Sequence, residues 1–317
     1  VLVAIEPWNF PFYQLLRVAA PAIAAGNPVL VKPAGIVPKS ARLIEELILE
    51  AGAPKGAWTT VFASKDQIAA LLRDDRVQGV TLTGSEQAGG AVAAEAGRNL
   101  KKSVLELGGS DIFAVLDDAD LDQAVEAGAA SRLAGAGQVC TGAKRFLVHE
   151  KIADRFIEKL VRKFAAIRVG DPMDEAVDLG PLCSVEARDS LAGQVRDAVA
   201  GGARVLHGGD PIPGGAWFQP TILTGVTPDN PAYHQEFFGP VAQVHIVRDD
   251  DALVALANDS PFGLGGSIFS ADVARARLAG AQTFRNEQRA GNSIAARAER
   301  LAERHRRRRG RREGDHR

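Results

Sequence analysis

Long uncharged apolar runs are absent from this 317-residue sequence, and cysteine is scarce. No stretch approaches the roughly 18 apolar residues of a membrane-spanning helix. The apolar start at residues 1–5 is too short for a signal peptide and has no basic segment before it. The two cysteines, Cys140 and Cys183, give no support to a disulfide framework or a zinc cluster. These absences predict a cytoplasmic protein without a membrane partner and without a bound metal.

The composition is otherwise that of an ordinary globular protein, with 46% hydrophobic and 24% charged residues. The chain is long enough to form more than one domain. Its net charge of −1 hides an asymmetry, because residues 297–317 contain ten arginines against four acidic residues. That local charge of +6 leaves about −7 for the remainder. Taken alone, this tail fits an arm that binds nucleic acid.

Short apolar runs alternate with helical patterns along much of the chain, which predicts parallel strands joined by crossover helices. The fold class is therefore α/β. Strands are expected at residues 1–5, 28–31, 59–62, 79–83, 111–116 and 145–149. Helices are expected at residues 39–51, 65–74, 121–133 and 151–164.

Three polar side chains stand in settings that suit acyl transfer. Cys140 follows the small residues Gly135, Ala136 and Gly137, which let the backbone approach a substrate closely. Glu106 has leucine on both sides, an apolar setting that suits a general base. A thiol nucleophile, a carboxylate base and the Asn9 amide as oxyanion donor are the groups that such chemistry needs.

Each of these residues also has a structural interpretation. A cysteine in apolar surroundings commonly packs as a small hydrophobic residue. Glu106 also fits a solvated carboxylate at the end of a strand, and an asparagine before an aromatic residue and a proline is usually a turn former. Cys183 matches no catalytic motif, so we expect a structural role for it.

A cofactor loop is predicted where Thr83-Gly84-Ser85 follows a strand and opens a helix that contains Gly89. Amides at a helix N-terminus favour a pyrophosphate. The G-x-G-x-x-G fingerprint of dinucleotide-binding folds does not occur at the required position between a strand and a helix. As a bare pattern, Gly84-Ser85 with a glycine four residues after the serine is weak evidence for a cofactor loop.

Six motifs together resemble the aldehyde dehydrogenase superfamily, in the order and at the approximate spacing of that family. The sequence as a whole is most similar to the bacterial succinate-semialdehyde dehydrogenases, and the resemblance runs from Val1 to about Ser270. The motifs are Trp8-Asn9-Phe10-Pro11, Lys32-Pro33, Thr83-Gly84-Ser85, Leu105-Glu106-Leu107-Gly108-Gly109, Gly137-Gln138-Val139-Cys140 and Glu236-Phe237-Phe238-Gly239-Pro240.

The resemblance implies oxidation of an aldehyde, with NAD or NADP, through a thioester on Cys140. Glu106 would activate the water that hydrolyses this thioester, and Asn9 with the Cys140 backbone N–H would bind the oxyanion. The implied cofactor-binding residues are Trp8, Lys32, Gly35, Gly84, Ser85, Gly89, Leu107, Gly108, Glu236 and Phe238. At Gly35 many NAD-preferring relatives carry a glutamate that repels a 2′-phosphate, so we expect use of both cofactors or a preference for NADP.

Arg17, eight residues after Asn9, resembles the arginine with which succinate-semialdehyde dehydrogenases bind the carboxylate of their substrate. An arginine on a helix surface is the competing interpretation. The residues before the nucleophile, Leu133, Ala134 and Gly135, are smaller than those usual in the family. The shape of the substrate pocket is therefore left open.

The resemblance also predicts a domain organisation: a partial dinucleotide-binding domain at residues 1–108, a catalytic domain at 109–275 and an atypical, disordered or helical tail at 276–317. The chain is expected to lack the family's N-terminal segment, and its arginine-rich end fits a shifted reading frame. The family forms homo-oligomers through a bridging strand that the sequence does not show, so oligomerisation is doubtful for this chain. Two alternatives stay open: an inactive fragment of an aldehyde dehydrogenase, and nucleic-acid binding through the tail.

Overall fold

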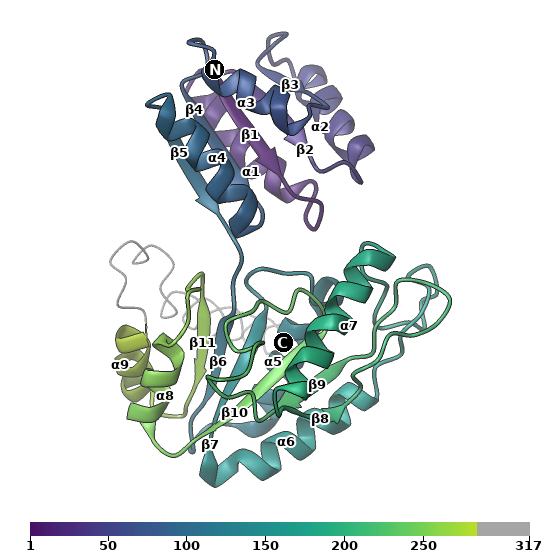
Figure 1. Cartoon of the computed structure of the whole chain (residues 1–317), viewed down its shortest axis with the longest axis vertical. Coiled ribbons are helices and arrows are strands. Elements are labelled where there is room, and N and C mark those ends of the chain that lie inside the picture. Colours follow the sequence, from purple (N-terminus) through teal and green to yellow (C-terminus); the bar gives the residue numbers. More distant parts are fainter. Residues whose placement is uncertain (284–317) are drawn as a thin grey trace, which may run out of the picture. The chain divides into compact units, whose positions relative to one another are not determined.

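The computed structural model describes residues 1–283, which divide into two compact units (Figure 1). The first unit is Val1–Gly108, and the second begins at Gly109. The boundary predicted from the sequence falls at the same position, while the functional names of the two parts stay predictions. The arginine-rich residues 297–317 lie outside the described residues.

The first unit contains a five-stranded parallel sheet with the order β3-β2-β1-β4-β5. Its strands are β1 (Leu2–Glu6), β2 (Val29–Pro33), β3 (Trp58–Thr60), β4 (Gly79–Thr83) and β5 (Lys102–Glu106). Its helices are α1 (Tyr13–Ala24), α2 (Pro38–Glu50), α3 (Lys65–Arg73) and α4 (Glu86–Arg98). This order reverses between β1 and β4, the position at which doubly wound sheets bind ligands at the carboxyl ends of their strands.

Alternating side chains place apolar residues on both faces of this sheet. Val3 packs with Ile68 of α3 and Ala96 of α4, whereas the next residue, Ala4, packs with Leu15 of α1 and Ile44 of α2. Consecutive strand residues point to opposite faces. The helices α1 and α2 therefore cover one face and α3 and α4 the other, as Figure 1 shows. Burial on both faces explains why β1 and β2 are nearly continuous apolar runs.

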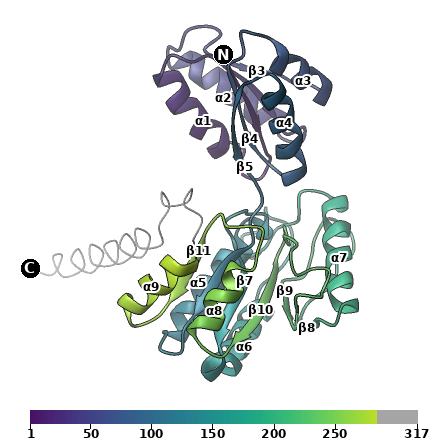
Figure 2. The same ribbon diagram turned by 60° about the vertical axis from the view of Figure 1, so that its left-hand side comes forward.

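The second unit contains a six-stranded sheet with the order β11-β6-β7-β10-β9-β8, in which β8 pairs antiparallel to β9 (Figure 2). Its strands are β6 (Asp111–Val115), β7 (Ala143–His149), β8 (Arg204–His207), β9 (Thr221–Thr224), β10 (Val241–Val247) and β11 (Gly266–Phe269). Its helices are α5 (Leu121–Leu133), the 3-10 turn η1 (Ala134–Gly137), α6 (Glu150–Ala165), α7 (Val185–Ala200), α8 (Asp250–Asn258) and α9 (Val273–Thr283).

Aromatic packing anchors the centre of this second sheet. The Phe113 ring on β6 lies 5.0 Å from the Phe146 ring on β7 and 4.6 Å from the Phe269 ring on β11, measured between centroids. Phe156 of α6 is fully buried beside Phe146. Truncating a buried phenylalanine of this kind typically costs about 3–5 kcal/mol. The strand β7, which follows Cys140, is therefore anchored in a packed core.

The α/β class predicted from the sequence is confirmed, and the ends of the predicted elements differ from the observed ones by a few residues. Other differences are larger. The helix α1 and the strand β5 were not predicted, nor were the elements that follow α6, which are α7, α8, α9 and β8 to β11. Among residues 1–283, no helix is both long enough and apolar enough to cross a membrane.

Candidate active site

The nucleophile loop, residues 134–142, follows α5 and leads into β7 in the second unit. Gly135, Ala136 and Gly137 all have left-handed backbone, with φ of +56°, +55° and +75°. For alanine this conformation costs about 1–3 kcal/mol and persists only where the surroundings enforce it. Here the surroundings include the buried cluster of Leu191 and Phe237, to which Ala136 belongs. The loop before Cys140 is therefore held in a strained shape.

Two glycines allow the loop to pack directly on neighbouring backbone. A Cβ on Gly137 would lie 2.2 Å from the carbonyl carbon and oxygen of Gly239. A Cβ on Gly109 would lie 2.5 Å from the carbonyl oxygen of Cys140. Because no side chain fits at either position, three segments singled out in the sequence, around Gly109, Cys140 and Gly239, lie against one another in this unit.

Lys144 connects the same three segments through its side chain. Its ammonium donates to the carbonyl oxygens of Val139 and Cys140, both at 2.8 Å, and lies 3.1 Å from Glu236 Oε1. The same Glu236 oxygen accepts a hydrogen bond from the Gly109 backbone N–H at 3.1 Å. The Lys144 side chain is 0% exposed. No catalytic or cofactor motif predicted a role for Lys144 from the sequence.

A second fully buried cation supports the loop from α5. Arg132 is 0% exposed and donates from Nη2 to the Gly137 carbonyl oxygen. Its Nε and Nη1 atoms have no hydrogen-bond partner among residues 1–283. Burial lowers the pKa of Arg132 to about 10, and the carboxylates of Glu236 and Asp111 oppose this shift. Burial likewise lowers the pKa of Lys144 to about 8.

Asp111, at the start of β6, completes this buried charge cluster. Burial raises its pKa to about 6, while Lys144 and the Gly265 backbone N–H act in the opposite direction. Burial also raises the pKa of the Cys140 thiol, with Lys144 as the main opposing charge. The thiol is half-buried and free. The cluster thus contains two cations and two carboxylates around one candidate nucleophile.

Cys183 lies in the same unit and is also free and half-buried. Its backbone N–H donates to Gln138 Oε1 at 2.8 Å, and Gln138 Nε2 donates to the Gly135 carbonyl at 3.0 Å. The backbone at Cys183 therefore helps to hold the nucleophile loop through Gln138. Burial raises the pKa of the Cys183 thiol.

A different polar cluster stands at the carboxyl ends of three neighbouring strands in the first unit. Glu6 ends β1, Thr83 ends β4 and Glu106 ends β5, and Thr83 pairs in register with Glu106. Arg17 of α1 donates from Nη2 to Thr83 Oγ1 at 3.0 Å. The Arg17 side chain is exposed and lies 6.0 Å from the centre of the Tyr13 ring.

Glu6 is the unexpected member of this cluster. It is 2% exposed, and neither carboxylate oxygen makes a hydrogen bond of standard geometry among residues 1–283. Burial raises its pKa to about 7; the nearby Thr83 hydroxyl and Arg17 oppose this shift, and Glu106 adds to it. A glutamate at the end of an apolar strand, at the same sheet edge as Glu106, was the signal that sequence reasoning missed.

The predicted cofactor loop has the expected local form. Ser85 caps α4 by accepting a hydrogen bond from the Ala88 backbone N–H at 3.3 Å, and the Gly84 N–H donates to the Glu106 carbonyl at 2.9 Å. A Cβ on Gly89 would lie 2.4 Å from Leu107 Cδ2. The loop at Gly84 and Ser85, the N-terminus of α4 and Leu107 therefore lie next to one another. That arrangement suits a pyrophosphate.

The remaining predicted residues of the first unit lie at the same carboxyl edge of the sheet. Lys32 is the fourth residue of β2, and Gly35 follows that strand in open space, with nothing within 4 Å of a Cβ built on it. Trp8 and Asn9 lie in the turn after β1 and are half-buried. Gly108 closes this unit, whereas Phe238 lies beside Phe237 in the second.

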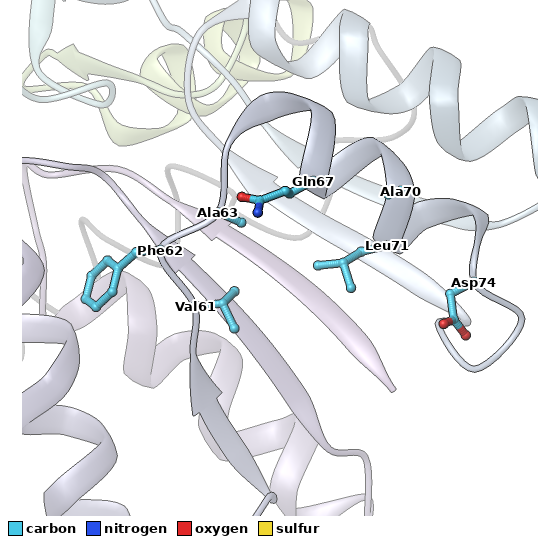
Figure 3. A pocket seen from close by; sticks show the side chains of 7 residues that line it. All are labelled: Val61, Phe62, Ala63, Gln67, Ala70, Leu71 and Asp74. Carbon is cyan, nitrogen blue, oxygen red and sulfur yellow. The ribbon is translucent and has the colours of Figure 1, made fainter.

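A pocket of about 490 Å³ lies between the end of β3 and α3, where Val61 and Leu71 point into the space (Figure 3). None of the predicted site residues lines it. Its lining residues are Val61, Phe62, Ala63, Gln67, Ala70, Leu71 and Asp74. Across residues 1–283, no group of three or more His, Cys, Asp or Glu side chains is placed to hold a metal ion.

Comparison with known proteins extends these observations. The model of the aldehyde dehydrogenase family matches residues 1–305, well beyond the expected limit near Ser270. A succinate-semialdehyde dehydrogenase [NADP(+)] of Deinococcus radiodurans is 52% identical over 87% of this chain and 58% of its own length. A succinate semialdehyde dehydrogenase [NAD(P)+] of Escherichia coli is 47% identical over 87% of this chain and 60% of its own.

Solved structures show the same similarity. Succinic semialdehyde dehydrogenase from Streptococcus pyogenes, crystallised with NADP+ as the cofactor, superposes with a TM-score of 0.87 at 48% identity. That similarity covers 89% of this chain and 62% of the other. The chain thus spans about three fifths of the length of the relatives that it matches.

Proposed function

The chain belongs to the aldehyde dehydrogenase family, and on that basis we propose that it oxidises succinic semialdehyde to succinate with NADP or NAD. The observation that carries this proposal is the nucleophile loop: a half-buried thiol on a strained backbone, with a buried ammonium bonded to its own carbonyl. Such a loop fixes a nucleophile in place. The names of the similar proteins support the choice of substrate.

In the proposed reaction, the Cys140 thiolate attacks the aldehyde carbon and forms a carbon–sulfur bond. The carbonyl oxygen becomes an oxyanion, and the Asn9 side-chain amide and the Cys140 backbone N–H have the role of its donors. A bound nicotinamide supplies the acceptor for the hydride that leaves this carbon. Glu106 then removes a proton from water, which attacks the resulting thioester, releases the acid and restores the thiol.

The cofactor residues of this chain suit a phosphate-bearing dinucleotide. The pyrophosphate would lie at the N-terminus of α4, where Ser85 is the N-cap. Gly84, Ser85 and the first backbone amides of the helix would hold it. Gly89 is buried in α4 and has no side chain, which lets this helix pack directly against Leu107. Lys32 and the open position at Gly35 leave room for a 2′-phosphate. NADP is therefore the proposed preference.

Arg17 is the proposed ligand of the substrate carboxylate. Its guanidinium is exposed and is anchored at one nitrogen by Thr83. A planar guanidinium binds a carboxylate through paired hydrogen bonds. This assignment distinguishes succinic semialdehyde from a neutral aldehyde of the same length, which has no group for Arg17 to bind.

We also propose a cytoplasmic location. The proposed nucleophile is a free thiol, which stays reduced in that compartment. Reduced Cys140 is required for the attack, because a disulfide at this sulfur has no thiolate to offer.

The test is cofactor reduction by the purified, folded chain with succinic semialdehyde, with NADP and NAD as separate acceptors. Cys140→Ser should abolish turnover, and Cys183→Ser is the matched control that should retain it. Turnover that survives in Cys140→Ser would refute the thiol mechanism. A folded chain without any turnover would favour the inactive-fragment alternative.

A further inference from the structure

Lys144 is buried more completely than its chemistry favours. Transferring an ammonium out of water costs several kcal/mol unless the charge is paired and hydrogen-bonded. The side chain is 0% exposed, and its three donors have three acceptors: two carbonyl oxygens of the nucleophile loop and one oxygen of Glu236. Burial lowers the pKa of Lys144 to about 8, so at neutral pH the side chain is still mainly an ammonium, which has no lone pair for proton abstraction. Its role is therefore not that of a base.

We propose that Lys144 is a positioning residue with two effects on Cys140. Its hydrogen bonds fix the backbone at Cys140, and its positive charge favours the thiolate, whereas the negative charge of Glu236 disfavours it. The proposal rests on the proposed function, in which Cys140 is the nucleophile. It assigns a role to a side chain that neither touches the substrate nor moves a proton.

The mechanical half of the proposal follows from the loop geometry. The strained residues Gly135 to Gly137 end just before Cys140, and Arg132 binds the carbonyl of Gly137 at that end. At the other end of the loop, the Lys144 ammonium donates to the carbonyl oxygens of Val139 and Cys140. Two buried cations thus hold both halves of a loop that has a strained backbone, which fixes the direction of the Cys140 peptide.

The electrostatic half follows from the signs of the surrounding charges. The titratable groups that face the thiol are Lys144 on β7, Asp111 on β6 and Glu236 before β10, while Arg132 on α5 faces Lys144. The Lys144 charge favours the thiolate, and the Glu236 and Asp111 charges oppose it. Neutralising Lys144 and neutralising Glu236 should therefore change the reactivity of the thiol in opposite directions. A purely structural brace predicts no such opposition.

The experiment measures the alkylation rate of Cys140 by iodoacetamide against pH, in a Cys183→Ser background so that one thiol reports. No aldehyde or cofactor is present, and a Cys140→Ser, Cys183→Ser double variant gives the blank. Lys144→Met should slow alkylation at neutral pH by about tenfold, the effect of one pKa unit on the thiolate fraction. Glu236→Gln should accelerate it several-fold under the same conditions.

Opposite changes in the two variants support the proposal. A Lys144→Met profile that superposes on the parent, or changes of the same sign in both variants, would overturn it. Circular dichroism confirms that each variant is folded. If Lys144→Met does not fold, Glu236→Gln and Asp111→Asn decide instead: both should accelerate alkylation, and an unchanged or slower rate would refute the proposal.

This test is independent of turnover. If the parent enzyme oxidises the aldehyde but the alkylation rates do not move in opposite directions, the role of Lys144 is wrong and the proposed function stands. If the alkylation rates change in opposite directions but no aldehyde is oxidised, the role of Lys144 stands and the proposed function is wrong.

Discussion

The two units each contain a cluster of charged side chains, and the clusters differ in whether their cations are buried. In the second unit, Lys144 and Arg132 are fully buried and donate to backbone carbonyls of the same chain. In the first unit the buried member is the acid Glu6, and the cation Arg17 is exposed. The buried cations support a loop through its backbone carbonyls, whereas the exposed Arg17 leaves part of its guanidinium open to solvent.

The largest expected effect comes from breaking the packing of the second cluster. Gly137→Ala places a Cβ 2.2 Å from the Gly239 backbone at a residue with φ of +75°. The clash and the strain together should lower the free energy of unfolding by about 4 kcal/mol. Gly214→Ala is the matched control, with φ of +93° and open space, and should cost about 1–2 kcal/mol. Equal losses in urea unfolding would contradict the tight packing.

The buried acid of the first cluster gives a pH signature. Burial raises the pKa of Glu6 from 4.5 to about 7, so the folded state binds the proton more tightly than the unfolded state. The resulting stability is fully present below pH 4.5 and is lost as the pH rises through about 7. Glu6→Gln should remove this loss, making the variant more stable than the parent by up to about 3 kcal/mol above pH 7.

Urea unfolding at a series of pH values measures this effect. Glu46→Gln, at an exposed position of α2, is the control and should leave the pH dependence unchanged. A Glu6→Gln curve parallel to that of the parent would show that Glu6 does not titrate in this range.

The exposed cation of the first cluster is tested by substrate discrimination. Arg17→Met should raise the KM for succinic semialdehyde about 30-fold, which corresponds to the loss of about 2 kcal/mol of charge-assisted hydrogen bonding. The KM for butanal should stay within about twofold, because that aldehyde has no carboxylate. Arg42→Met, on the exposed side of α2, is the control. Equal changes for both aldehydes would assign Arg17 to the helix surface instead.

The smallest expected effect concerns the open edge of the first unit. Gly35→Glu is sterically tolerated, because nothing lies within 4 Å of the added Cβ and the backbone there has no left-handed φ. The added carboxylate should raise the KM for NADP about fivefold, an effect of about 1 kcal/mol between near-surface charges. The KM for NAD should not rise. Equal responses of the two cofactors would place the 2′-phosphate elsewhere.

The motifs and the α/β class could be predicted because they depend on residue type and local period. The helix Leu121–Leu133 was predicted with its observed ends, since Asp120 caps its first turn. The helix α1 was missed because its apolar sequence contains Pro21, which normally ends a helix. A short strand with exposed residues, β5, gives no apolar alternation to detect.

The residues that sequence reasoning missed in the site share one property: their burial decides their role. Lys144 and Arg132 belong to residue types that are almost always exposed, so the sequence favours a surface position for them. Ala136 gives no sign of its left-handed backbone, because that conformation is usually left to glycine. The sequence around Glu6 shows no sign of its role, because Thr83 and Glu106 come close to it only when β1, β4 and β5 are paired in the sheet.

The most direct test of the central claim is to trap the thioester by mass spectrometry. Glu106→Gln should slow the hydrolysis step, so acid quenching during turnover with succinic semialdehyde and NADP should leave a succinyl group on the peptide that contains Cys140. The account predicts this adduct in Glu106→Gln and none in Glu106→Gln, Cys140→Ser. A variant that reduces NADP without an adduct on Cys140, or with the adduct on Cys183, would contradict it.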